Sequence, residues 1–192
     1  MIKRFLSAAA VLAVSVTVAQ ANEFEPALRD FADSQVRGWL SDPTVIQAIN
    51  SQNGETASLS DDQIIGLDKQ WRAETAAGSR PMIDGVLGNA LSSYLQQKKD
   101  GAEGLVTEIF VMDAKGLNVG QSDVTSDYWQ GDEAKWKETF LVGPSSVHVS
   151  DVEMDESTQT FQSQVSLPVV DPANGQVIGA VTVGVNVEML AQ

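Results

Sequence analysis

The first part of the chain carries apolar residues at steps of three and four, the spacing of one helix face. In residues 24–40 this face consists of Phe24, Leu28, Phe31, Ala32, Val36, Trp39 and Leu40. Ser41-Asp42-Pro43 ends this helix and begins a second, because proline suits a first helical turn and Asp42 can cap it. The second helix is short, with a buried side formed by Val45, Ile46 and Ile49.

Two further helices follow in residues 60–95. Ser60-Asp61-Asp62-Gln63 has the form of a capping box ahead of a third helix, which contains Ile64, Leu67 and Trp71. Pro81 begins the fourth helix, which carries the most regular apolar stripe in the chain: Ile83, Val86, Leu87, Ala90, Leu91, Tyr94 and Leu95. The pattern therefore predicts one unbroken helix over residues 81–95.

At about Gly101 the apolar period changes to two, which indicates strands. Residues 107–113 are apolar on both alternating sets, as in a central strand covered on both faces, and after the turn Ala114-Lys115-Gly116 residues 117–121 return as a second strand. A polar and aromatic stretch with a short helix at residues 132–140 comes next. Residues 147–154, 160–170 and 177–187 predict three more strands, so the fold class is α+β, with N-terminal helices followed by a five-stranded antiparallel sheet.

The N-terminus predicts export. Lys3 and Arg4 precede an apolar, uncharged run at residues 5–18, and Ala19-Gln20-Ala21 supplies a cleavage site, so residues 1–21 form a signal peptide. The run is shorter than the about 20 residues that span a bilayer. We expect a soluble periplasmic protein, with full secretion as the alternative. Its single domain, residues 22–192, has a helical part at 22–100 and a sheet part at 101–192.

Composition narrows the function classes. The chain has 12 basic and 26 acidic residues, which argues against nucleic-acid partners and anionic membrane surfaces. It has no cysteine, which excludes disulfides, thiolate metal sites and a lipid anchor, and one histidine, His148, in a predicted strand. The acidic stretch around Asp151 and Glu153 lacks the spaced ligands of a calcium loop. We therefore expect no enzyme activity, no catalytic residues, no metal and no cofactor.

The order of the predicted strands, with a long loop and short helix after the second, is that of a PAS-like sheet. Four segments, residues 108–116, 126–136, 167–171 and 178–185, resemble bacterial periplasmic sensor domains of the Cache (PDC) type. The resemblance covers about Gln35 to the end, and Tyr128-Trp129 with the glycine-rich last strand are its most specific parts. It implies a PAS-like (Cache) fold that binds a small metabolite.

Members of that group usually lie between two membrane helices of a chemoreceptor, histidine kinase or cyclase. This sequence ends at Gln192, soon after its last predicted strand. We therefore expect a stand-alone domain that presents its ligand state to a separate membrane-bound receptor, histidine kinase, cyclase or transporter.

The resemblance places a ligand between the sheet and the loop that crosses it, which contains Asp127, Tyr128, Trp129 and Trp136. A pocket needs apolar walls and a few directed polar groups, and these residues supply both. The alternative is that Tyr128 and Trp136 only fasten the loop to the sheet. Amino-acid-binding members pair a Trp-Tyr step with a nearby arginine. Here the order is reversed and no arginine is close in sequence, so amino-acid specificity does not follow.

Three other residues are candidates for ligand contact. Trp71 and Arg72 lie together on the third helix, and an arginine that faces a pocket would bind a carboxylate through two hydrogen bonds. A surface salt bridge is the alternative use of Arg72. Gln164 lies on the polar face of the fourth strand and would line the pocket, unless it faces solvent or pairs across strands.

Two functions from different classes remain. The first is a periplasmic sensor domain for a small molecule such as an organic acid or amino acid. The second is a non-enzymatic interaction or structural protein that forms a homodimer through its N-terminal helix and keeps no functional pocket.

Overall fold

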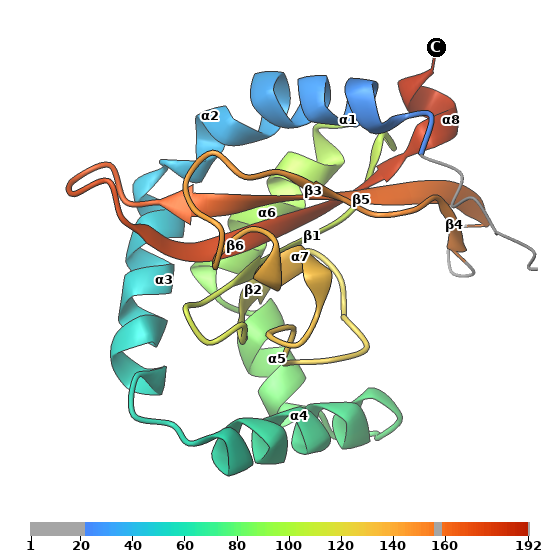
Figure 1. Ribbon diagram of the computed structural model, residues 1–192. Helices are drawn as coiled ribbons and strands as arrows, with labels where there is room; N and C mark the ends of the chain where they lie inside the picture. Colours follow the sequence, from blue (N-terminus) through green and yellow to red (C-terminus); the bar gives the residue numbers. More distant parts are fainter. Residues whose placement is uncertain (1–21, 156–158, 192) are drawn as a thin grey trace, which may run out of the picture.

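One antiparallel sheet is covered by helices on one face and by an irregular crossing segment on the other (Figure 1). The computed structural model describes residues 22–155 and 159–191; residues 1–21, with the predicted signal peptide, lie outside the described part. The sheet order is β2-β1-β6-β5-β3, with β4 also paired to β5. Its strands are β1 (Val106–Met112), β2 (Asn118–Gln121), β3 (His148–Val149), β4 (Glu153–Asp155), β5 (Thr160–Val170) and β6 (Val177–Asn186).

The helices of the described part come mostly before the sheet. They are α1 (Glu25–Phe31), the π-helical segment η1 (Ala32–Val36), α2 (Arg37–Leu40), α3 (Pro43–Thr56), α4 (Asp61–Thr75), α5 (Pro81–Leu87), α6 (Ala90–Asp100), α7 (Ala134–Lys137) and α8 (Val187–Leu190). Helices followed by an antiparallel sheet in this order confirm the α+β class and the PAS-like arrangement expected from the sequence.

Local capping signals are confirmed. The Asp42 side chain accepts a hydrogen bond from the Thr44 N–H at 2.8 Å, and α3 begins at the next residue, Pro43, although it is longer than the short helix expected there. Ser60 and Gln63 form the predicted capping box at the start of α4. Side-chain oxygens of this kind satisfy N–H groups that have no partner inside the helix.

Three predicted elements differ from the structure. The single helix over 81–95 is wrong: α5 ends before Gly88, and the Asn89 side chain caps α6 by accepting from the Ser92 N–H at 2.7 Å. The single strand predicted over 147–154 is divided into two short strands, β3 and β4. Between them, the Ser150 hydroxyl accepts a hydrogen bond from the Gln164 N–H at 2.8 Å, in place of a backbone carbonyl. The sheet therefore has one strand more than expected among the described residues. The last strand ends at Asn186, which caps α8.

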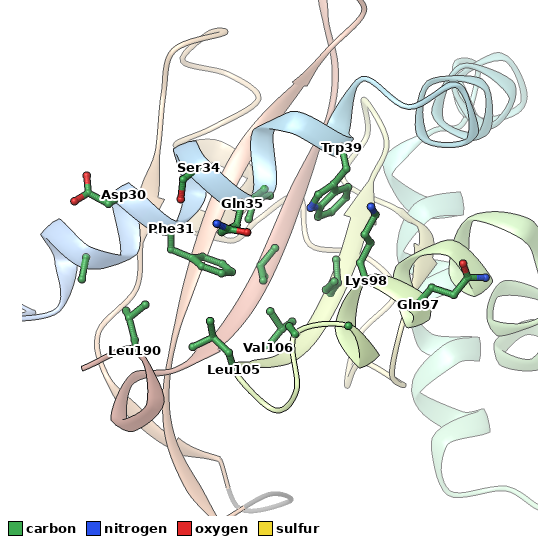
Figure 2. A pocket seen from close by; sticks show the side chains of 16 residues that line it. Asp30, Phe31, Ser34, Gln35, Trp39, Gln97, Lys98, Leu105, Val106 and Leu190 are labelled. Atoms are coloured by element: carbon green, nitrogen blue, oxygen red, sulfur yellow. The ribbon is translucent and has the colours of Figure 1, made fainter. Parts of the chain in front are cut away.

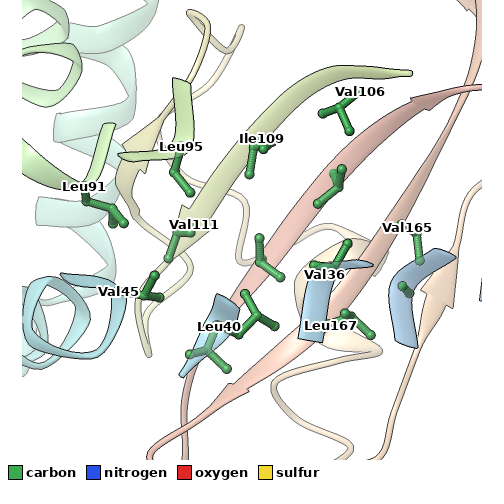
Figure 3. Packing of buried hydrophobic residues seen from close by; sticks show 14 of the residues in the cluster. Val36, Leu40, Val45, Leu91, Leu95, Val106, Ile109, Val111, Val165 and Leu167 are labelled. Carbon is green, nitrogen blue, oxygen red and sulfur yellow. The ribbon is translucent and has the colours of Figure 1, made fainter. Parts of the chain in front are cut away.

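The face of the sheet toward α1, α3 and α6 is mostly apolar, with the buried Ser163 as a polar exception. It carries Ile109, Val111, Val119, Val165, Leu167, Val169, Val181, Val183 and Val185, all buried. Figure 3 shows four of them, Ile109, Val111, Val165 and Leu167, together with Val36, Leu40, Val45, Leu91 and Leu95 from the helices. Each such side chain contributes about 1.5–3 kcal/mol when fully buried. This layer anchors the sheet, so the other face is free to carry polar residues.

Glu74, near the end of α4, is buried under the start of α5. One of its oxygens, Oε2, accepts hydrogen bonds from the N–H groups of Met82 at 2.8 Å and Ile83 at 3.1 Å. Burial by itself raises the pKa of Glu74. Hydrogen bonds from Gln70 and the two N–H groups, with the charge of Arg80, outweigh burial and lower the pKa below its usual value of 4.5.

A lowered folded-state pKa predicts a pH dependence of stability. The contribution of Glu74 should be complete above about pH 4.5, its unfolded value, and lost as the pH falls through the lower folded-state pKa. Urea unfolding of the parent chain and Glu74→Gln should therefore differ most at neutral pH and converge in acid. A stability difference that stays constant across this range would contradict the ionic role of Glu74.

Among the described residues, no helix has the length and apolar character needed to cross a bilayer. The same residues contain no group of three or more histidine, aspartate or glutamate side chains placed to hold a metal ion.

Candidate ligand-binding site

The face of the sheet toward the crossing segment, residues 122–147, carries covered polar side chains on β5 and β6, beside an apolar cluster that includes Phe110 and Met112. Ser166 and Thr182 lie opposite each other on β5 and β6, are fully buried, and have hydroxyl oxygens 3.0 Å apart. Alternation along β5 brings Gln162 and Gln164 to the same face. Polar groups cost free energy to bury unless they are paired. A face with only a packing role would be expected to resemble its apolar reverse side, so this face is the candidate site.

A glycine allows polar side chains to meet across the middle of this face. Gly184 on β6 lies between Glu108 on β1 and Gln164 on β5 in the strand register. The Gln164 amide passes over it and donates to the Glu108 carboxylate at 2.8 Å. A Cβ at position 184 would lie 2.4 Å from the Thr107 hydroxyl and 2.8 Å from the Glu108 side chain, so any larger residue would disrupt the pair.

A cleft of about 290 Å³ opens beside this pair, between the start of α7 and strands β3 to β5. Its lining is mostly polar and consists of Glu133, Ala134, Lys135, His148, Ser150, Asp151, Glu153, Gln162 and Gln164. The volume is close to the lower end of the range for small-molecule sites, about 300–1,000 Å³. It would suit a ligand the size of a single amino acid or small amine.

The charges of the lining are unequal. Glu133, Asp151 and Glu153 contribute carboxylates, and Lys135 contributes the ammonium group, which is 2.8 Å from Glu133 and therefore already neutralised. His148 lies 3.0 Å from the Glu138 carboxylate. Burial raises the pKa of Glu108, while the Gln164 hydrogen bond and Lys135 oppose the shift. The cleft is thus an environment that favours a positively charged group.

Trp136 on α7 packs the crossing segment onto the sheet next to the cleft. Its indole N–H donates to the Asp113 carbonyl at 3.1 Å, and its ring stacks on Phe140 with centroids 4.9 Å apart. It belongs to an apolar cluster with Phe110 and Met112. Trp136 therefore fixes the position of its neighbour Lys135, whose side chain lines the cleft.

Five of the seven predicted site residues gather elsewhere, around α4. Trp71 is fully buried and stacks on Tyr128 with ring centroids 5.3 Å apart, and its indole N–H donates to the Thr125 carbonyl at 2.8 Å. The Trp129 indole N–H donates to the Lys115 carbonyl at 2.9 Å. Arg72 is half-exposed and its guanidinium lies 2.8 Å from Asp127.

Asp68 holds this second group together. Its carboxylate accepts from the N–H groups of Tyr128 at 3.0 Å and Trp129 at 3.1 Å, and pairs with Arg72 at 2.7 Å. The structure thus brings Trp71, Arg72, Asp127, Tyr128 and Trp129 together at the base of the crossing segment, and leaves Trp136 and Gln164 at the sheet. Of these seven, Gln164 lines the cleft described above.

The sequence reasoning missed several residues of the cleft. Gln162 could have been found, since it shares the alternating face of Gln164. Glu108 could not, because its meeting with Gln164 depends on the register of three strands.

No family model matches the sequence, and no curated protein matches it. Solved structures similar to this chain include the E. coli DcuS sensor domain, at 14% identity and a TM-score of 0.47, covering 87% of this chain and 96% of that one. The ligand-binding domain of the Campylobacter jejuni chemoreceptor Tlp3 with 4-methylisoleucine has 13% identity and a TM-score of 0.40, covering 87% and 61%. The V. cholerae histidine kinase DctB sensor domain has 11% identity and a TM-score of 0.39, and the match covers 88% of this chain and 59% of that one.

The chain therefore spans about three fifths of the length of the Tlp3 and DctB structures, and almost all of the DcuS structure.

Proposed function

We propose that this chain is a sensor domain that binds a small polar metabolite in the cleft between α7 and β5. The observation that carries the proposal is the group of covered polar side chains on β5 and β6, with the Glu108–Gln164 pair beside the cleft, on a sheet whose reverse side is mostly apolar. A few directed polar groups in a concave site are what a small ligand requires for orientation. The proposal is for binding without chemistry.

The charges of the cleft favour one ligand class within this proposal. Three lining carboxylates face one ammonium group that already has a partner, so a ligand with an ammonium group gains more than a dicarboxylate. An amino acid or amine is thus preferred over a simple organic acid. Lys135 would remain available to a ligand carboxylate if it left Glu133.

The cleft also suggests how binding would be communicated. Lys135 is the second residue of the short helix that Trp136 attaches to the Asp113 carbonyl. A ligand that attracts Lys135 away from Glu133 would shift α7 and, through it, the crossing segment. We propose that the domain works in the periplasm and that this change is presented to a separate membrane receptor, histidine kinase, cyclase or transporter.

A Gln164→Ala variant tests the site. Removal of the amide leaves Glu108 without its 2.8 Å hydrogen bond, so ligand-induced stabilisation should fall sharply. A thermal-shift panel of amino acids, amines and dicarboxylic acids should find a ligand for the parent chain, with an increase in stability of about 2.7 kcal/mol at a hundredfold excess over Kd. The same ligand should give little or no shift with Gln164→Ala.

Gln176→Ala is the matched control, because Gln176 lies exposed in the turn before β6. It should keep the full shift. A panel without any shift would instead favour the non-enzymatic interaction protein that dimerises through its N-terminal helix. An undiminished shift in Gln164→Ala would move the site away from this cleft, toward the group around Trp71.

A further inference from the structure

A second, larger concavity lies on the apolar side of the sheet. It is a groove of about 650 Å³ between the N-terminal helix and the segment from α6 to β1. Figure 2 shows Phe31 and Trp39 pointing toward it from the helix, opposite Leu105 and Val106, with Leu190 at one end. The floor is formed by aliphatic and aromatic side chains, so the groove is suited to an apolar chain rather than a polar metabolite.

The helix that forms one wall is π-helical where it borders the groove. The segment η1, Ala32–Val36, contributes Ser34, Gln35 and Val36 to the lining. Such π-helical turns are rare, and they occur frequently at functional sites. This local geometry is a second, separate indication that the groove has a role beyond packing.

The one positively charged side chain that lines the groove among the described residues, Lys98, lies at one end. Lys98 is half-buried beside Trp39, as Figure 2 shows, and its ammonium lies 5.0 Å from the centre of the Tyr94 ring. Among the described residues no carboxylate forms an ion pair with Lys98, although the pKa of Asp42 is lowered by hydrogen bonds from Thr44 and, to a smaller extent, by the charge of Lys98. Gln97 lies next to it on the rim. This end therefore offers hydrogen-bond donors and a positive charge to an anion.

We propose that the groove binds a straight-chain aliphatic carboxylate. Its carboxylate would lie at Lys98, and its chain would run past Phe31 and Leu105 toward Leu190. Charge complementarity sets this direction, because the only charged side chain lining the opposite part of the groove among the described residues is the exposed carboxylate of Asp30. The site is on the other face of the sheet from the cleft of the proposed function and does not depend on it.

Calorimetric titration with sodium dodecanoate, below its micelle concentration, tests the proposal. We expect saturable binding of one molecule per chain. Decanoate, which is shorter by two methylenes, should bind about fifteenfold more weakly, since each methylene removed from water is worth about a factor of four. Dodecyltrimethylammonium, with the same chain and the opposite charge, should show no saturable binding.

Lys98→Met removes the charge and keeps the unbranched stem. It should weaken dodecanoate binding at least tenfold, while Lys69→Met, at an exposed position on α4 at the far end of the molecule in Figure 1, should leave it unchanged. Gln35→Trp should block the groove and abolish binding while the circular dichroism stays that of the parent. If Lys98→Met does not fold, Lys98→Gln replaces it.

Three results would overturn the proposal. Dodecanoate affinity unaffected by loss of the Lys98 charge would remove the head-group site, and equal binding of dodecyltrimethylammonium would show only a non-specific apolar surface. Sedimentation could also show a dimer that is unchanged by dodecanoate but dissociates in Gln35→Trp. That result would assign the groove to a second copy of the chain.

Discussion

Replacing Asp113 by alanine should lower the free energy of unfolding by about 3 kcal/mol or more. Asp113 is fully buried where β1 enters its turn, and its two oxygens accept four hydrogen bonds. Oδ1 accepts from the N–H groups of Lys115 at 2.8 Å and Leu117 at 2.9 Å, and Oδ2 from Thr56 at 2.8 Å and Gln52 at 3.1 Å. Each donor left buried without a partner costs about 1–3 kcal/mol.

Urea denaturation measures this loss. Asp113→Asn should fall between the parent and Asp113→Ala, because an amide keeps one acceptor oxygen but presents a donor where Oδ1 or Oδ2 now accepts. Asp84→Ala, at an exposed ion pair with Arg80, is the control and should change stability by less than about 0.5 kcal/mol. A loss below about 1 kcal/mol in Asp113→Ala would mean that water replaces the carboxylate.

Asp113 also shows why the sequence predicted elements better than contacts. The turn at residues 114–116 was predictable from local composition, but nothing in the sequence joins Asp113 to Gln52 and Thr56, about 60 positions earlier. The capping residues Asp42 and Ser60 were found because their partners lie two or three residues away. Signals that act within one turn of the chain can be read from the sequence, and long-range pairings cannot.

The broken fourth helix has a similar explanation. Its apolar stripe continues from Ile83 through Leu87 to Leu91, because α5 and α6 both turn an apolar side inward. The spacing of apolar residues therefore gave no sign of the break at Gly88. Asn89 caps α6, and its side chain also donates to the Val119 carbonyl at 2.8 Å, a long-range contact that fixes it against β2.

The candidate site was predicted in part. Alternation along β5 correctly put Gln164 on the face away from Val165, and the structure adds its partner Glu108 across Gly184. Arg72 and Asp127 were chosen for separate reasons and prove to be ion-paired with each other. In this ion pair the Arg72 guanidinium is already bound to a carboxylate of the chain, so it is not free to bind a ligand carboxylate. Whether Tyr128 and Trp129 touch a ligand stays a prediction.

Replacing Trp71 by alanine should destabilise the fold by about 3–5 kcal/mol. The side chain is fully buried, stacks on Tyr128 and lies in the cluster formed by Ile64, Ile83 and Leu117. Truncation of a buried tryptophan leaves a large cavity and also strips the Thr125 carbonyl of the indole N–H at 2.8 Å. Trp71→Phe keeps most of the ring and loses the hydrogen bond, so its cost should be about 1–2 kcal/mol.

The phenylalanine variant separates packing from ligand contact. If Trp71 only supports the crossing segment, Trp71→Phe should unfold at a lower urea concentration and keep the ligand-induced thermal shift of the parent chain. Loss of the shift at nearly unchanged stability would place a ligand against the indole, and with it against Tyr128. Trp71 and Gln164 belong to separate groups of residues. The double variant should therefore combine the lower stability of Trp71→Phe with the lost ligand response of Gln164→Ala, and neither change should alter the size of the other.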